Sequence, residues 1–423
     1  MLTYIYDRHI VPDRSDRNGT IPISWLKQYG RLALPSKWTA EAWRELDAES
    51  KRFIYRSCVD LKWFFHKVFL PYESETEGEP YPKALPQYQI EYADEMQARL
   101  PLEILPYSRK PVDEPVRRLC AVFPTGHFKS TMTCEMLPLY LIGCNPSITM
   151  VAVSSTKEKA ERFITSAKSH LMNNSVFIWV FGELRAENVS GPWTMDAIQV
   201  DRPVDRSAPT LSVMGYGGAI QGMRYDCAFV DDIMTLQMSR TELQRDRVWD
   251  FINHNLITRL HPRRRVLFVV GSRMHGDDTY ARIAREAKEK GTWSYMERSV
   301  IVGGPWPPGR LDESKPYSMD NVIIPQDLKV LWPEFWSKEK IIEDFISDPH
   351  TFARSRLNMP QDPESKIFKW DVLEMCMADG GVDRDGNVKP LLSRWPDEYG
   401  IPEPGSDLYE QYRVAGINCS LLR

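Results

Sequence analysis

The chain has 423 residues, of which 42% are hydrophobic and 26% charged, and its formal net charge is −4. These values are those of an ordinary soluble globular protein with room for two or three domains. They give no global basic field, so any contact with nucleic acid must depend on local basic patches.

The seven cysteines include no CxxC pair and are odd in number. This usage indicates free thiols in a reducing cytoplasm rather than a disulfide framework or a cysteine zinc site. The N-terminus carries charges throughout and has no apolar signal core, and no run approaches the ~18 apolar residues of a membrane span. We therefore expect a soluble cytoplasmic protein that does not contact a membrane.

Residues 1–85 are expected to form an N-terminal helical extension. Apolar residues between positions 39 and 70 recur at helical spacing, with Thr39 in the N-cap position. The stretch "PYESETEGEPYPKALP" then ends this pattern, because it contains four prolines.

From residue 116 the pattern changes to short apolar runs separated by helical stretches. The runs are "RLCAVF", "SITMVAV", "DCAFVDD" and "RVLFVVGS", and the helical stretches include "TKEKAERFITSAKSHLM" and "RTELQRDRVWDFINHNL". Buried strands that alternate with helices predict an α/β fold with a mainly parallel sheet over residues 86–300. Residues 301–365, rich in proline and tryptophan, are expected to form a small irregular subdomain. Residues 366–423 are expected to be a linker with one strand-like run, "YRVAGIN".

The stretch "CAVFPTGHFKSTMTC" has most of a phosphate-binding loop, which is written GxxxxGK[ST]. A strand, a loop and a helix start would aim backbone N–H groups at an anion, with Lys129 on the β- and γ-phosphates and the Ser130 hydroxyl at Mg²⁺. Phe128 takes the place of the second glycine. It can still donate its N–H if its φ stays negative and its ring points away from the nucleotide. Alone the motif is a weak signal, because Gly-x-x-Lys-Ser is common by chance.

Two other apolar runs end in polar residues. "DCAFVDD" ends in Asp231 and Asp232, which could hold Mg²⁺ through water and orient the attacking water; alternatively, both acids cap the next helix. "RVLFVVGSRMHGDD" carries Ser272 and Arg273, which could sense the γ-phosphate. The alternative for Arg273 is an ion pair with one of the two aspartates that follow it.

Together these segments resemble the large terminase subunits, which are the DNA-packaging motors of tailed bacteriophages. "FPTGHFKST" is similar to their PRGHGKST loop (Walker A), "GGAIQGMRYDCAFVDDIM" to the run into their Walker B strand, and "GSRMHGDDTYARI" to their coupling segment. "VLWPEFWSKEKI" and "FARSRLNMPQDPESKIF" resemble the segments that close their ATPase region, and "LPQYQIEYADEM" lies where they hold the adenine. The resemblance runs in order from about residue 85 to 368 and implies a P-loop NTPase of the ASCE type.

The resemblance implies ATP and Mg²⁺ as cofactors, with Lys129 on the phosphates, Ser130 and Asp231 at Mg²⁺, and Asp232 as the catalytic carboxylate. Which glutamine contacts the adenine stays open. The implied nucleotide-binding residues are Gln87, Tyr88, Gln89, Pro124, Thr125, Gly126, His127, Phe128, Lys129, Ser130 and Thr131.

The coupling element implied by the resemblance is Ser272 with Arg273. The family often has an arginine four residues before the lysine, a candidate charge stabiliser, where this chain has Thr125. An arginine that stabilises charge would then come from elsewhere. The candidates are Arg224 or Arg273 in the same chain, and Arg263, Arg264 or Arg265 from a neighbouring subunit. The alternative for this arginine triplet is a solvated strand entry.

Large terminases normally continue into a nuclease domain whose first strand ends in a metal-binding aspartate. "RVAGINCS" resembles that strand, but Asn418 stands at the aspartate position and the chain stops five residues later. An asparagine lacks the charge that a two-metal site needs, so we expect no DNA cleavage by this chain.

The expected function is an ATP-driven motor that moves double-stranded DNA into a viral procapsid through the portal. The resemblance implies the portal protein and the small terminase subunit as partners, and a homo-oligomeric ring on the portal formed from monomers in the host cytoplasm. Two alternatives remain. One is another ASCE-type DNA-dependent ATPase, such as a helicase, and the other is an assembly protein that binds nucleotide without hydrolysing it.

Overall fold

A computed structural model describes residues 37–38, 40–78, 84–101, 104, 116–185, 191–204, 206–218 and 222–360. The chain divides into two compact units, residues 1–360 and 361–423, and every described residue belongs to the first. The predicted N-cap Thr39 and the nuclease-like strand with Asn418 lie outside the described residues.

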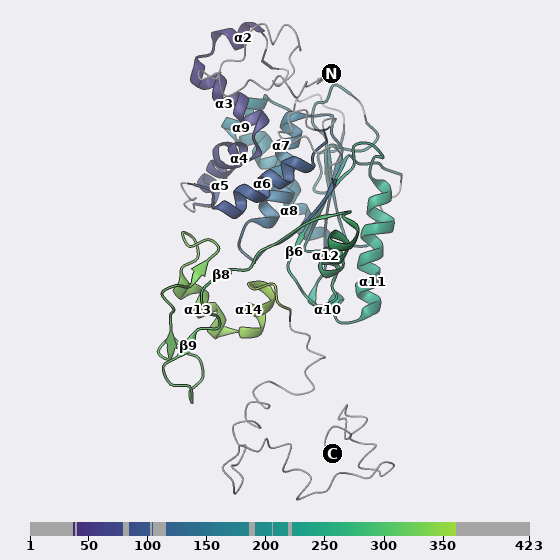
Figure 1. The fold of residues 1–423 in the computed structure, drawn as a ribbon. Coiled ribbons are helices and arrows are strands. Elements are labelled where there is room, and N and C mark those ends of the chain that lie inside the picture. Colours follow the sequence, from purple (N-terminus) through teal and green to yellow (C-terminus); the bar gives the residue numbers. More distant parts are fainter. Residues whose placement is uncertain are drawn as a thin grey trace, which may run out of the picture. The chain divides into compact units, whose positions relative to one another are not determined.

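The stretch with helical spacing is helical, but several short helices replace one long one. They are α2 (Ala40–Glu45), α3 (Ala48–Val59), α4 (Leu61–Phe64), the π-helix η2 (Phe65–Phe69) and α5 (Leu70–Glu77), followed by α6 (Gln87–Arg99). The breaks fall at Asp47 and Asp60, whose carboxylates accept backbone N–H groups as N-caps. The ring of Phe64 packs on Tyr140 at 5.1 Å between centroids, so this extension lies against the core (Figure 1).

The core is a seven-stranded sheet in the order β3–β4–β2–β5–β6–β1–β7. Its strands are β1 (Arg118–Val122), β2 (Met150–Ser154), β3 (Ala197–Ile198), β4 (Leu211–Gly215), β5 (Cys227–Asp231), β6 (Val266–Gly271) and β7 (Ser294–Glu297). All neighbouring pairs are parallel except β3 with β4. This confirms the prediction of a mainly parallel sheet in an α/β fold, and the four predicted strands are β1, β2, β5 and β6.

Helices cover both faces of the sheet. They are η3 (Thr131–Met136), α7 (Leu137–Cys144), α8 (Lys157–Asn173), α9 (Ser175–Phe181), α10 (Leu236–Ser239), α11 (Glu242–Asp250), η4 (Phe251–Leu256), η5 (Ile257–Arg259) and α12 (Thr279–Lys290). On β1, Leu119 and Ala121 join the apolar cluster that includes α7 and α8, whereas Cys120 and Val122 join the cluster that includes α11 and α12. Because both faces are buried, the strands appear in the sequence as continuous apolar runs.

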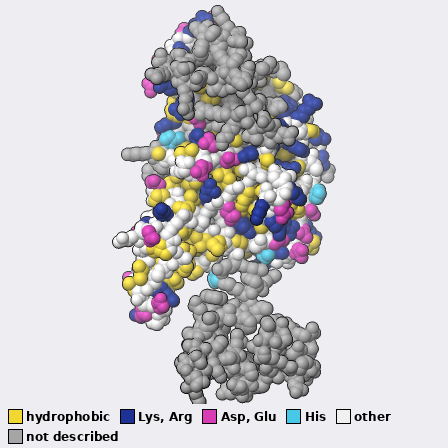
Figure 2. Space-filling model, viewed as in Figure 1, with side chains coloured by type: hydrophobic (Ala, Val, Ile, Leu, Met, Phe, Trp, Pro, Cys, Tyr) yellow, Lys and Arg dark blue, Asp and Glu magenta, His cyan; other side chains and the backbone are white. Residues whose placement is uncertain are grey.

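Residues 301–360 contain regular elements where irregular chain was expected. These are β8 (Ile301–Gly303), β9 (Gly309–Arg310), β10 (Val322–Ile323), β11 (Lys329–Val330), α13 (Lys338–Ser347) and α14 (Pro349–Ser355). β9 pairs with β10 and β8 with β11, both antiparallel. Figure 2 shows apolar side chains gathered over β8 and α13, in a segment where Val302 and Phe335 are exposed.

The five described cysteines are buried free thiols, which agrees with the prediction from their spacing. Within the described ranges, no helix combines the length and the apolar character that a bilayer span requires.

Candidate active site

The predicted site residues meet at the edge of the sheet where β1, β5 and β6 end. β6 lies between the other two strands, with Gly271 beside Val122 of β1 and Val270 beside Asp231 of β5. The phosphate loop of residues 123–128 follows β1. Parallel strands place their carboxyl ends at one edge, so the loop and the aspartates come together although they are far apart in sequence.

Phe128 adopts the backbone conformation of a glycine. Its φ is 59°, so the negative φ considered from the sequence is wrong. The ring packs against Trp332 and Phe335, with centroids 5.3 and 6.2 Å away. A left-handed conformation costs a phenylalanine about 1–2 kcal/mol, and these aromatic contacts offset part of that cost. The loop thus has the backbone conformation that a glycine at position 128 would adopt, and Phe128 is strained in it.

The C-terminal part of the described chain holds the loop backbone in place. Trp336 donates from Nε1 to the Gly126 carbonyl oxygen at 3.3 Å. The Arg356 guanidinium donates to the Thr125 carbonyl oxygen, and the Thr125 N–H donates to the Ser355 carbonyl oxygen at 2.9 Å. Gly126 has φ 76°, and a Cβ there would lie 2.7 Å from the Trp336 ring, so glycine is required at this position.

His127 is a fully buried residue of the loop. Its ring stacks on Trp336 with centroids 5.9 Å apart, and its Nδ1 lies 3.1 Å from the Thr125 carbonyl oxygen. Burial, together with the Arg356 and Lys129 charges, lowers the pKa of His127 to about 4. The ring is therefore neutral near pH 7. Its stacking on Trp336 fixes the position of the loop. Pro124 is also buried, whereas Thr131 is partly exposed.

Ser130 and Asp231 are in direct contact. The Ser130 hydroxyl donates to Oδ1 of Asp231, and Arg162 of α8 donates from Nη2 to Oδ2 at 2.8 Å. Lys129 is 5% exposed, and its charge lowers the pKa of Asp231. Burial and then the Asp232 charge have the larger effect, so the pKa of Asp231 is raised overall. The hydroxyl of Ser130, just after the phosphate loop, is therefore hydrogen-bonded to the carboxylate at the end of β5.

Asp232 is strained and incompletely paired. Its φ is 41°, and its N–H donates to the Val270 carbonyl oxygen at 3.0 Å. Its Oδ1 is buried and accepts no hydrogen bond from any described residue. The next helix, α10, is capped by Thr235, so the two aspartates do not cap it. Residues with strained backbones and unpaired buried atoms cluster at functional sites.

The predicted adenine-contact residues lie at the start of α6. Gln87 is exposed and donates to Glu91 at 3.2 Å. Gln89 is fully buried and donates to the Tyr88 hydroxyl at 3.0 Å, which in turn donates to the His127 carbonyl oxygen at 3.3 Å. Gln87 is thus the accessible glutamine of the two, and Tyr88 supports the loop. Their contact with an adenine stays a prediction.

The two coupling residues lie in different surroundings. Ser272 follows Gly271 between the loop strand and the aspartate strand and is 4% exposed. Arg273 donates from Nε to both carboxylate oxygens of Asp278 at 3.2 Å, and its Nη1 lies 3.8 Å from the Glu297 carboxylate. This is the ion pair considered as the alternative for Arg273, so its catalytic and coupling roles stay predictions.

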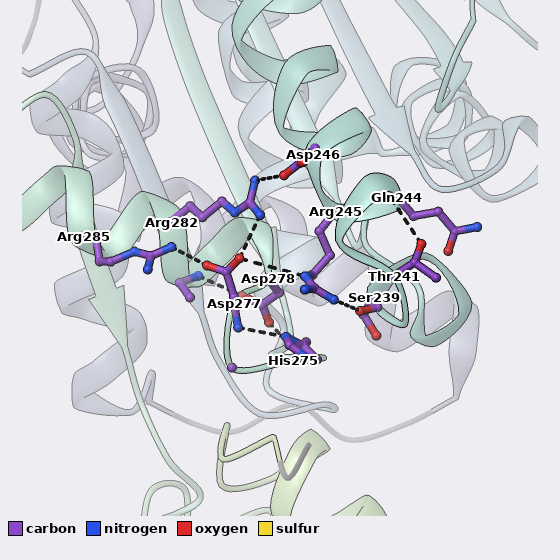
Figure 3. Close-up of polar contacts among 12 residues, drawn as sticks. Ser239, Thr241, Gln244, Arg245, Asp246, His275, Asp277, Asp278, Arg282 and Arg285 are labelled. Carbon is purple, nitrogen blue, oxygen red and sulfur yellow. Dashed lines mark hydrogen bonds and ion pairs between the residues drawn. The ribbon is translucent and has the colours of Figure 1, made fainter. Parts of the chain in front are cut away.

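Residues 272–278, between β6 and α12, form the loop that carries the predicted coupling residues (the coupling loop). Asp277 connects this loop to two helices (Figure 3). Its carboxylate contacts Arg282 at 2.8 Å and also Arg285, both on α12, and lies 4.0 Å from Arg245 on α11. Arg282 also donates to Asp246 of α11 at 2.6 Å. Since α11 follows β5 and the coupling loop follows β6, this network links the loops of two adjacent strands.

The other candidate arginines lie at the opposite edge of the sheet. Arg224 precedes β5, and the triplet 263–265 precedes β6. Arg264 contacts Asp226 at 3.0 Å. A strand of five or six residues spans about 17–20 Å, so none of them reaches the phosphate loop of its own chain. Their action in a neighbouring subunit stays a prediction.

Two charged residues of the site were not identified from the sequence. Arg162 lies on the helix after β2, and only the strand order places β2 beside β5. Glu135 lies on η3, where burial and the Glu73 charge raise its pKa to about 7 although Arg162 lowers it. The available signal for Arg162 was its place in the first half of the predicted helix "TKEKAERFITSAKSHLM", which follows a predicted strand. The sequence does not show which other strand that helix lies beside.

Comparison with solved structures gives a likeness in fold, whereas the sequence comparisons give no match. No protein-family model matches the chain, and no curated protein sequence does. The crystal structure of the HK97 bacteriophage large terminase matches with a TM-score of 0.41 and 12% identity. The match covers 71% of this chain and 56% of that chain, so the chain spans a little over half the length of that terminase.

Proposed function

We propose that this chain is the ATP-hydrolysing motor subunit of a bacteriophage terminase. The observation that carries the proposal is the contact of Ser130 with Asp231, 101 residues apart, beside the strained Asp232. This contact supports a nucleotide site where the altered loop sequence alone is a weak signal. The ordered resemblance of the segments between residues 85 and 368 supports a terminase rather than another ATPase.

The donor set suits Mg²⁺, which proteins hold with one or two carboxylates and the substrate's phosphates. Ser130 and Asp231 would hold it, and when bound it would neutralise charge on the β- and γ-phosphates. The backbone N–H groups that begin the helix at Lys129 would bind the phosphates, with the Lys129 ammonium beside them. The Asp232 carboxylate, whose Oδ1 accepts no hydrogen bond from the described residues, would orient the attacking water and take its proton.

The motor assignment adds movement to this chemistry. β6 lies between β1, which precedes the predicted phosphate loop, and β5, which ends in Asp231. Ser272, directly after β6, would contact the γ-phosphate and shift when it is lost. The coupling loop, which Asp277 connects to α11 and α12 by ion pairs, would move with it. The partners we propose are double-stranded DNA, the portal protein and the small terminase subunit, with a ring of identical subunits on the portal.

The test is hydrolysis of ATP by the purified chain with Mg²⁺, with and without double-stranded DNA. Lys129→Ala and Asp232→Asn should each lower the rate at least ~100-fold. Asp250→Asn, on the exposed side of α11, is the matched control and should leave the rate unchanged. Full hydrolysis by Asp232→Asn would show that Asp232 is not the catalytic carboxylate.

Two other outcomes would favour the alternatives. Tight, Lys129-dependent ATP binding without hydrolysis would favour the assembly protein. Stimulation by single-stranded DNA alone would favour a helicase-like ATPase over a packaging motor.

A further inference from the structure

Arg162 reaches the site from outside the motifs that define it. Its guanidinium donates to Oδ2 of Asp231 at 2.8 Å, while Ser130 occupies Oδ1 of the same carboxylate. Asp231 is 1% exposed, but the Arg162 side chain is 54% exposed. A long cationic side chain therefore extends from the surface of α8 to the one carboxylate that joins the phosphate loop to the aspartate strand.

The arginines considered from the sequence are otherwise engaged or distant. Arg273 is 14% exposed and held by Asp278. Arg224 and the 263–265 triplet lie at the other edge of the sheet, and Thr125 stands where related loops carry an arginine. Arg162, by contrast, already contacts an oxygen beside the proposed phosphate position.

The ion pair of Arg162 can exchange partners. When Arg162 leaves this pair, water can solvate its guanidinium, so only the buried carboxylate of Asp231 needs a new partner. A guanidinium also presents several donors in a fork that matches the oxygens of a phosphate. Asp231 would be a ligand of Mg²⁺ if the ion were bound, and its charge would then attract Arg162 less strongly. The oxygens of a neighbouring phosphate would in that case be the stronger partner for the guanidinium.

We propose that Arg162 is a catalytic residue of its own subunit, moving from Asp231 to the γ-phosphate oxygens during ATP hydrolysis. This rests on the proposed function. In that step the water oxygen bonds to the γ-phosphorus as the bond to the bridging oxygen breaks. The bridging electron pair stays on ADP, and the water proton passes to Asp232. Arg162 supplies positive charge where the equatorial oxygens gain negative charge.

The experiment compares Arg162→Gln and Arg162→Lys with Lys157→Gln, which removes an exposed positive charge from the same helix. Arg162→Gln should lower kcat at least ~100-fold, with Arg162→Lys between it and the unaltered protein. Affinity for ADP with beryllium fluoride, a ground-state mimic, should change less than ~3-fold. Affinity for ADP with aluminium fluoride, a transition-state mimic, should fall at least ~30-fold. Lys157→Gln should match the unaltered protein throughout.

Equal loss of affinity for both mimics, or a kcat within ~3-fold in Arg162→Gln, would overturn the proposal. Mixing Arg162→Gln with Lys129→Ala distinguishes action within a subunit from action between subunits. Because each variant lacks a residue of its own site, the mixture should stay inactive, and recovered hydrolysis would contradict action within the subunit. If the unaltered protein neither hydrolyses nor binds ATP through Lys129, the proposed function itself fails.

Discussion

Two buried aspartates flank the apolar run of strand β5, and each is paired with an arginine: Asp226 stands directly before the strand, and Asp231 is its last residue. At the amino end, Asp226 is 3% exposed and contacts Arg264, which is itself only 19% exposed. It also accepts the Thr149 N–H at 3.2 Å. At the carboxyl end, Asp231 is 1% exposed, but its partner Arg162 is 54% exposed. The two carboxylates are buried to a similar extent, but the arginine that pairs with Asp231 is much more exposed than the one that pairs with Asp226.

We infer from this difference that the Asp226–Arg264 pair is structural, whereas in the Asp231–Arg162 pair the arginine can exchange its partner. A pair in which both members are buried cannot change partners without leaving a charge unsolvated. In a pair with an exposed cation, water solvates the cation after separation, and only the buried carboxylate needs a new partner. Backbone strain follows the same division, because the described non-glycine residues with positive φ are Phe128, Asp232 and Asn358, and all three lie at the carboxyl edge. Strain at functional sites persists where the surrounding structure enforces it.

The comparison predicts opposite effects for two identical substitutions. Asp231→Asn should lower ATP hydrolysis at least ~100-fold and leave the free energy of unfolding equal or higher, because burial and the Asp232 charge raise the pKa of Asp231. Asp226→Asn should lower the free energy of unfolding by about 2–4 kcal/mol, because Arg264 loses its buried partner. Its hydrolysis per folded molecule should change less than ~3-fold. Urea denaturation and steady-state ATPase assays measure both, and similar phenotypes for the two variants would remove the distinction.

A second prediction concerns Glu135, which adds an unfavourable negative charge to the carboxyl edge. Burial and the Glu73 charge raise its pKa to about 7. The folded state therefore binds this proton more tightly than the unfolded chain, and the stability this provides is lost as the pH rises from 4.5 through 7. Glu135→Gln should differ from the unaltered protein by less than about 1 kcal/mol at pH 5 and be about 3 kcal/mol more stable at pH 8.5.

Urea denaturation at the two pH values measures this difference. Glu242→Gln, at an exposed position of α11, is the matched control and should give the same change at both pH values. An equal change at both pH values for Glu135→Gln would contradict the pH dependence.

A third and smaller prediction tests the strain at Phe128. Both Phe128→Ala and Phe128→Gly lose the contacts with Trp332 and Phe335, but only glycine relieves the left-handed backbone. Phe128→Gly should therefore be about 1 kcal/mol more stable than Phe128→Ala. The control is the same pair of substitutions at exposed Lys288 on α12, where alanine should be the more stable by roughly 1 kcal/mol. Thermal unfolding measures these stabilities. If the alanine variant is more stable than the glycine variant at position 128 as well as at position 288, Phe128 carries no strain.

The parts of this architecture that depend on local sequence could be predicted. Continuous apolar runs identified β1, β2, β5 and β6, and the Lys129–Ser130 pair marked the start of the helix. Strand β7 was missed because it is short and only partly buried. The contact of Arg162 with Asp231 could not be predicted, since it depends on which strands are neighbours. The positive φ of Phe128 likewise depends on aromatic residues far along the chain.

The contacts that hold the phosphate loop also set the order in which the protein can be made. Trp336 and Arg356 bind loop residues that precede them by 210 and 231 positions. A ribosome therefore releases the whole central sheet before the residues that brace the loop have been synthesised. Contacts between such distant positions form late in folding, because a long segment must first be ordered. A nascent chain would thus hold this loop in its final conformation only after residue 356 has been synthesised.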